Sequence, residues 1–137
     1  RKLAQAEAAC KAMQERYGVT LTAVEAADNL ARAAAIRGAQ IVFATGAAGV
    51  VLLEPEHWLD NPTIELIADA NATPPLGVGG LDVMDRGTLH NGKIAWGAIG
   101  FGTLKLALHR ACIARLFEDN RTVLDAAEIY ALAKTMA

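Results

Sequence analysis

The sequence predicts an α/β fold, a parallel sheet of the Rossmann type with flanking helices. Two observations carry this prediction. The 137-residue chain, one domain in length, is 53% hydrophobic but only 5% aromatic, so Ala, Val, Ile and Leu must build its core. Such a core suits helices packed on a parallel sheet. Short, continuously apolar segments also alternate with helical patterns, and glycine-bearing loops follow them. In open α/β sheets, ligands bind at the edge where such loops lie.

The first half of the chain should hold two helices, two strands and a helical turn. Gly18 is a typical helix stop, Asp28 is a good N-cap and Pro55 suits the first turn of a helix. In order, we expect a helix over 1–16, a strand over 19–23, a helix over 28–36 ended by Gly38, a strand over 41–44 and a short helix over 56–59.

The second half should add two strands and two longer helices. Asn91 and Gly92 mark a tight turn, and Asp125 with Glu128 forms a capping pair. In order, we expect a strand over 64–68, a loop over 69–80, a strand over 93–96, a helix over 102–118 and a final helix from Asp125 to Met136.

The strands at 19–23 and 41–44 match the third and fourth strands of a Rossmann sheet, so we expect the sheet to lack its first two strands. In the order 3-2-1-4-5-6, those two strands lie between them. We therefore expect no ladder between 19–23 and 41–44, and parallel pairing of 41–44 with 64–68. On this interpretation the chain is a fragment that binds cofactor poorly and turns nothing over alone.

The segment 95–105 is rich in glycine and runs into the helix over 102–118. That helix is apolar at Leu104, Leu108, Ala111, Cys112 and Leu116, close to a 3.6-residue repeat. No acidic residue lies between Asp85 and Glu118, so this window carries +5 and the remainder −7. A glycine-rich entry to a basic helix favours an anionic ligand. The alternative is a packed helix with a solvated basic side.

Two loops are candidates for ligand binding because little side chain would obstruct a ligand. The first, over 45–49, contains Thr45, Gly46 and Ala47 directly after a buried strand. The second, over 69–80, is stiffened by Pro74 and Pro75, and Asn71 offers an amide that could bond a carboxamide. Its glycines include Gly77 and Gly79. Ordinary structural loops are the alternative in both cases.

Lys105 is the candidate for the chemistry, because a lysine in the first turn of a helix can direct its charge at an anion. The histidines are scattered and fit no triad or metal site; His57 and His90 suit surface or capping roles. Arg1 and Lys2 are unfavourable at a helix N-terminus, which favours contact with the 2′-phosphate of NADP over a plain charged helix start.

Composition excludes several other classes. A net charge of −2 argues against nucleic acid as a partner, and no apolar run could span a bilayer. Cys10 and Cys112 show no metal-ligand spacing, so we expect two buried thiols and a cytoplasmic protein. A homo-oligomer is also expected.

Three stretches, 64–80, 104–114 and 125–134, resemble the bacterial NAD(P)-dependent methylene-tetrahydromethanopterin dehydrogenases of one-carbon metabolism. The resemblance covers essentially all 137 residues but only the C-terminal half of such an enzyme. It implies that residues 1–100 are part of an NAD(P)-binding Rossmann domain. Residues 101–137 would be C-terminal helices that pack toward a pterin domain and return to the interdomain cleft.

The resemblance also implies a reaction and a set of site residues. Hydride would pass directly from the methylene carbon of the reduced pterin to NADP or NAD, with no metal or flavin. The active-site lysine would be Lys105, the cofactor loops 45–46 and 71–80, and the ribose-phosphate region Arg1 and Lys2. Two alternatives stay open: a methylene-tetrahydrofolate dehydrogenase, and a non-catalytic nucleotide-binding module.

Overall fold

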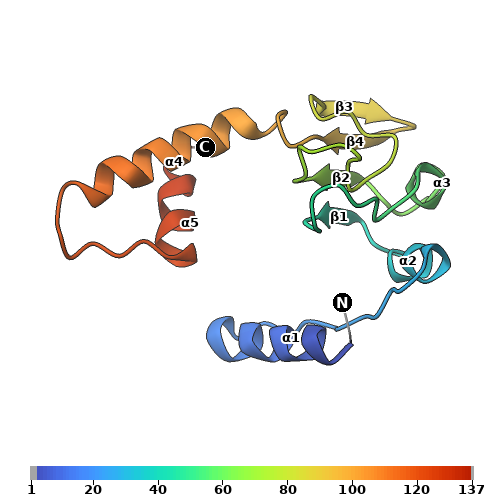
Figure 1. Cartoon of the computed structure of the whole chain (residues 1–137), viewed down its shortest axis with the longest axis horizontal. Helices are drawn as coiled ribbons and strands as arrows, with labels where there is room; N and C mark the ends of the chain where they lie inside the picture. Colours follow the sequence, from blue (N-terminus) through green and yellow to red (C-terminus); the bar gives the residue numbers. More distant parts are fainter. Residues whose placement is uncertain (1–2, 137) are drawn as a thin grey trace.

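A four-stranded sheet lies at the centre of the fold, in a computed structural model that describes residues 3–136. Its strands are β1 (Ile41–Ala44), β2 (Leu66–Asp69), β3 (Arg86–His90) and β4 (Lys93–Trp96), in the order β1-β2-β4-β3 (Figure 1). β1, β2 and β4 run parallel, and β3 is antiparallel to β4. With its flanking helices this is a mixed α/β fold of Rossmann-like type, which confirms the predicted class.

One face of the sheet carries the hydrophobic core. Ala44 of β1, Ile67 of β2 and Ala95 of β4 are buried there, and Trp58 packs with them from α3 (Pro55–Trp58). Ile36, which follows α2 (Asn29–Ala35), packs against this cluster. Alternation along the strands therefore directs every second side chain into a core that α2 and α3 help to close.

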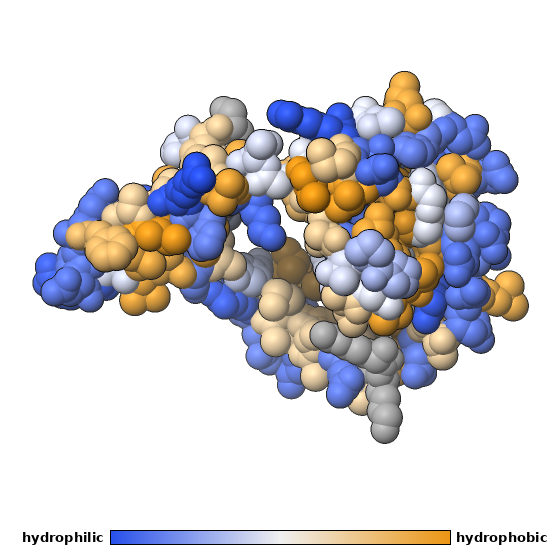
Figure 2. All heavy atoms as spheres, turned by 45° about the horizontal axis from the view of Figure 1, so that its top comes forward, coloured by the Kyte–Doolittle hydropathy of each residue, from blue (hydrophilic) through white to orange (hydrophobic). Residues whose placement is uncertain are grey.

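The opposite face of the sheet is apolar but largely uncovered. Ile41 and Phe43 of β1 are 58% and 69% exposed, and Ile94 of β4 and Leu89 of β3 are also exposed. Figure 2 shows hydrophobic side chains gathered at the surface of the sheet part. Parallel sheets are normally buried on both faces, so this side of the sheet is where the molecule can still accept a ligand or another element.

Three helices extend away from the sheet: α1 (Leu3–Tyr17), α4 (Gly102–Leu116) and α5 (Ala126–Lys134) (Figure 1). α4 packs against α5, and Arg16 of α1 forms an ion pair with Asp125 at the start of α5. The expected apolar stripe of α4 does not form a buried seam, because Cys112 is its only buried residue and Leu104 and Leu116 are exposed.

The predicted strand at 19–23 is wrong. These residues form neither helix nor strand, and no ladder within residues 3–136 joins them to β1. A strand exists only through its hydrogen-bonded neighbour, and β1 has β2 on one side and a free edge on the other. The predicted parallel pairing of β1 with β2 is confirmed.

The predicted order of elements is corrected at β3. The sequence pattern predicts no strand at residues 86–90, yet these residues pair with β4 across the tight turn at Asn91 and Gly92. The alternation of β3 is hidden because four of its five residues are exposed and its ladder is irregular between Arg86 and Thr88. β2 also begins two residues later than expected, at Leu66.

The helix ends agree with the signals in the sequence. The Asp28 carboxylate accepts a hydrogen bond from the backbone N–H of Ala31 at 2.8 Å, and Asp125 with Glu128 forms the expected capping box. These bonds satisfy backbone donors that helical turns leave free. Of the two thiols, Cys112 is buried as expected, whereas Cys10 is only half-buried. No helix within residues 3–136 is long and apolar enough to cross a bilayer.

His90 does not have the surface or capping role that the sequence suggested. Its Nε2 lies 2.9 Å from Oδ2 of the buried Asp85, although the ring N–H is poorly aligned for a hydrogen bond. Burial raises the pKa of Asp85, but the backbone N–H of Asp82 and the imidazole of His90 outweigh burial, so the net pKa is lowered. This carboxylate ties the segment before β3 to the hairpin.

Because the pKa of Asp85 is lower in the folded state, its charge stabilises the fold above the unfolded pKa of about 3.9, and that contribution is lost as pH falls through the folded pKa. Asp85→Asn should therefore lower the free energy of unfolding by about 1–2 kcal/mol at pH 7. The deficit should shrink below about pH 4. Urea unfolding of both proteins across pH 3–7 measures it, and a deficit that stays constant over this range contradicts the assignment.

Candidate functional site

At the carboxyl edge of the sheet, the end of β1 and the loop that follows it line a cleft of about 760 Å³. The loop after β2 is hydrogen-bonded to this first loop. Three of the predicted cofactor residues, Thr45, Gly46 and Ala47, line the cleft. The full lining is Phe43, Ala44, Thr45, Gly46, Ala47, Val50 and Leu52. The cleft is thus placed where open α/β sheets bind ligands, and little side chain stands between a ligand and the backbone.

Asp69, the last residue of β2, holds the second loop in shape. Its side chain is fully buried; Oδ1 accepts a hydrogen bond from the backbone N–H of Asn71 at 2.9 Å, and Oδ2 accepts one from Val78 at 3.0 Å. One carboxylate therefore joins the start of the loop to its end. The close approach also explains Gly77, where a Cβ would lie 3.0 Å from Oδ1.

The second loop in turn holds the first. The Gly77 carbonyl accepts hydrogen bonds from the backbone N–H groups of Leu52 at 2.7 Å and Leu53 at 3.1 Å, and the N–H of Gly79 donates to the Leu53 carbonyl at 2.8 Å. The indole N–H of Trp58 donates to the Gly79 carbonyl at 2.9 Å. The two loops are consequently one hydrogen-bonded unit anchored on the core.

Asn71 supports the loop through both ends of its side-chain amide. Its Nδ2 donates to the Pro75 carbonyl at 3.2 Å, and its Oδ1 accepts from the backbone N–H of Thr73 at 2.9 Å. Both groups of the amide thus form hydrogen bonds inside the loop. The sequence instead suggested that this amide could bond a ligand. Pro74 is exposed on the same loop, and Gly79 packs against Pro55.

Arg32 of α2 is a supporting residue that the sequence analysis missed. Its guanidinium Nη1 donates to the backbone carbonyls of Val51 at 3.2 Å and Leu52 at 3.4 Å. The guanidinium thereby fixes the far end of the loop over 45–53. No motif marks this residue, because its two acceptors are main-chain carbonyls about twenty positions away.

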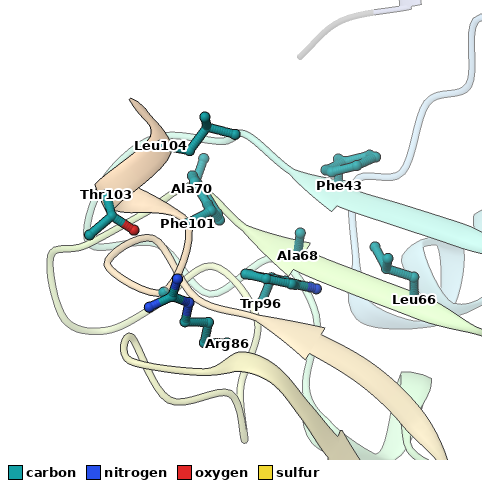
Figure 3. A pocket seen from close by; sticks show the side chains of 10 residues that line it. Phe43, Leu66, Ala68, Ala70, Arg86, Trp96, Phe101, Thr103 and Leu104 are labelled. Carbon is teal, nitrogen blue, oxygen red and sulfur yellow. The ribbon is translucent and has the colours of Figure 1, made fainter. Parts of the chain in front are cut away.

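A second pocket, of about 650 Å³, lies on the uncovered face of the sheet and reaches the start of α4 (Figure 3). Phe43 lines both this pocket and the cleft, so the two lie beside each other at β1. Arg86 is the one charged residue in the lining. The full lining is Phe43, Leu66, Ala68, Ala70, Arg86, Trp96, Gly100, Phe101, Thr103 and Leu104.

The glycines before α4 let backbone approach backbone. A Cβ on Gly100 would lie 1.7 Å from the Asp85 carbonyl oxygen, and one on Gly97 would lie 2.2 Å from that of Asp82. These two glycines therefore allow one backbone segment to pack closely on another. The tight contact fixes the position at which α4 leaves the sheet.

Lys105 is exposed in the first turn of α4, and its side chain does not line the pocket. Lys105 directly follows Leu104, which lines the pocket.

His57 has the capping role expected of it, since its Nδ1 accepts a hydrogen bond from the backbone N–H of Glu54 at 3.0 Å. Residues 3–136 contain no cluster of three potential metal ligands. The Arg1 and Lys2 prediction lies outside the described residues.

Two curated proteins are similar to the chain. It is 53% identical over 137 residues to Bifunctional protein MdtA of Methylorubrum extorquens, covering all of this chain and 48% of that protein. It is 32% identical over 128 residues to the NAD(P)-dependent methylenetetrahydromethanopterin dehydrogenase of the same organism, covering 91% of this chain and 43% of that protein.

The second of these relatives is named a dehydrogenase. The chain spans about half the length of the curated relatives it matches. No protein-family model matches it.

The Asp69 bonds predict a stability effect. Asp69→Asn replaces one of two acceptor oxygens with an NH₂ group, so one buried backbone N–H loses its partner. The free energy of unfolding should fall by about 1–3 kcal/mol. Asp119→Asn, on an exposed loop, is the control and should change it by less than about 0.5 kcal/mol. Equal effects of the two changes in urea unfolding would show that Asp69 does not organise the loop.

Proposed function

We propose that these residues form the cofactor-binding part of a larger NAD(P)-dependent dehydrogenase that oxidises methylene-tetrahydromethanopterin to the methenyl form. The observation that carries the proposal is the cleft at the carboxyl edge of the sheet, which is lined by the loop after β1 and held in place by the loop after β2. The name of the 32% identical relative gives the same class of reaction. Because the chain matches under half of each relative's length, other parts of the protein would supply the rest of the site.

The cleft fits a dinucleotide. Thr45, Gly46 and Ala47 present backbone at its wall, and Asp69, Gly77 and Gly79 hold that wall in place. NADP or NAD would supply the hydride acceptor when bound. Asn71 and Pro74 would act through the shape of the loop, because the amide of Asn71 is already engaged. Arg1 and Lys2 would meet the 2′-phosphate of NADP.

The substrate would lie on the side of the cleft toward α4. Residues 1–100 would form the Rossmann domain and 101–137 the helices that return toward a pterin domain. Lys105 would orient the pterin with its positive charge from the first turn of α4, where its side chain is exposed and free to meet a substrate.

One assay on a protein that contains this chain distinguishes the proposal from its two alternatives, a methylene-tetrahydrofolate dehydrogenase and a nucleotide-binding module. Reduced-nicotinamide absorbance is followed with NADP or NAD and either methylene-tetrahydromethanopterin or methylene-tetrahydrofolate. The proposal expects turnover with the first carrier. Turnover with the second alone would favour the folate enzyme. Cofactor binding without turnover on either would favour a nucleotide-binding module.

Lys105→Ala should lower the rate of hydride transfer at saturating cofactor at least tenfold while leaving the cofactor dissociation constant within about twofold. Arg110→Ala, an exposed cation on the same helix, is the matched control and should change neither value. Stopped-flow measurements give both quantities. An unchanged rate with weakened cofactor binding would make Lys105 a cofactor residue.

A further inference from the structure

A β-bulge in β3 places Arg86 on the uncovered face of the sheet. Thr88 pairs with Ala95 and Leu89 with Ile94, while Arg86 pairs with Trp96, so Gly87 is the extra residue. Gly87 has φ of +70°, which suits glycine, and it packs on the Trp96 ring. In a regular ladder Gly87 would face Trp96, and Arg86 would point to the core side. Bulges that redirect a side chain in this way are common beside active sites.

The pocket that Arg86 enters is aromatic on several sides. Phe43 comes from β1, Trp96 from β4 and Phe101 from the segment before α4. Figure 3 shows Phe43, Ala68 and Trp96 on the same side of the sheet, with the Arg86 guanidinium at the end of the pocket near Thr103. A volume of about 650 Å³ is of the size that small-molecule sites have.

Arg86 has no acidic partner within ion-pair distance in the described part of the chain. Its guanidinium is therefore a cation with free donors at the edge of an apolar, aromatic pocket. Flat rings bind well between aromatic side chains, and a guanidinium selects a ring that carries an oxygen acceptor in its plane. Because Phe43 lines both this pocket and the cleft, a ligand in the pocket would lie near the proposed cofactor.

We propose that this pocket binds a flat heteroaromatic ring that carries a carbonyl group, and that Arg86 recognises the carbonyl. Its place in the reaction rests on the proposed function, where two molecules carry such a ring: the nicotinamide end of the cofactor and the pterin of the one-carbon carrier. Arg86 is then a specificity-determining residue, which neither the motifs nor the relatives' names assign.

Trp96 and Trp58 report on the pocket separately in a protein that contains this chain. Trp96 lines the pocket, whereas Trp58 is fully buried in the core on the opposite face, so each indole N–H gives its own NMR signal. Trp96→Phe assigns the two signals. Nicotinamide and 6-methylpterin, both small neutral rings with a carbonyl, are titrated separately. One of them should shift the Trp96 signal to saturation and leave that of Trp58 unmoved, which identifies the source of the ring.

Arg86→Gln should weaken that binding roughly tenfold, because a hydrogen bond from a charged donor is lost. Arg86→Lys should retain part of the affinity, and Arg37→Gln, an exposed cation beyond α2, should change nothing. The proposal is overturned if neither ring shifts Trp96, or if Arg86→Gln binds as tightly as the unaltered chain.

The backbone amides of Thr45, Gly46 and Ala47, followed on addition of NADP, separate this outcome from failure of the proposed function. Shifts there without ring binding at Trp96 would overturn only the pocket assignment. Ring binding that depends on Arg86, without those shifts, would support the pocket and count against the cleft as a cofactor site.

Discussion

The buried carboxylate of Asp69 is the constraint on which the edge of the sheet depends. Burying a charge is costly unless hydrogen bonds replace its hydration, and here two backbone N–H groups do so. The same bonds close the loop after β2, bring the Gly77 carbonyl to Leu52 and Leu53, and so set the loop after β1. The cleft wall at Thr45 and Gly46 thus follows from a carboxylate that would not itself touch a ligand.

The two faces of the sheet have different roles. α2, α3 and the core cover one face, and that packing anchors the interlocked loops through Trp58. The other face leaves Phe43 and Trp96 available, and the bulge at Gly87 adds Arg86 to them. The alternation of strand residues therefore separates the face that carries the core from the face of the proposed pocket. The proposed cofactor cleft and aromatic pocket meet at Phe43, where the two faces share an edge.

Local signals in the sequence identified most elements, because caps and stops such as Asp28, Asp125 and Gly18 act within a few residues. They failed where the structure depends on distant partners. The segment 19–23 has strand composition but no neighbour within the described residues, and β3 is visible only through its pairing with β4. The candidate cleft was predicted from loops after strands. The roles of Asp69, Arg32 and Arg86 could not be predicted from the sequence. Each role depends on hydrogen bonds to distant backbone groups or on the register of a strand pair, and the spacing of residues reveals neither.

Native-state hydrogen exchange tests the central claim most directly, namely that Asp69 preforms a rigid edge on which NAD(P) binds. The account predicts that the amides of Leu52, Leu53 and Val78 are protected in the unliganded chain, because each donates to a buried acceptor. In a protein that contains this chain together with the parts that complete the site, NADP should then slow exchange at Gly46 and Ala47 and leave those three amides nearly unchanged. Rapid exchange at Leu52, Leu53 and Val78 without ligand, or no response to NADP at Gly46 and Ala47, would contradict it.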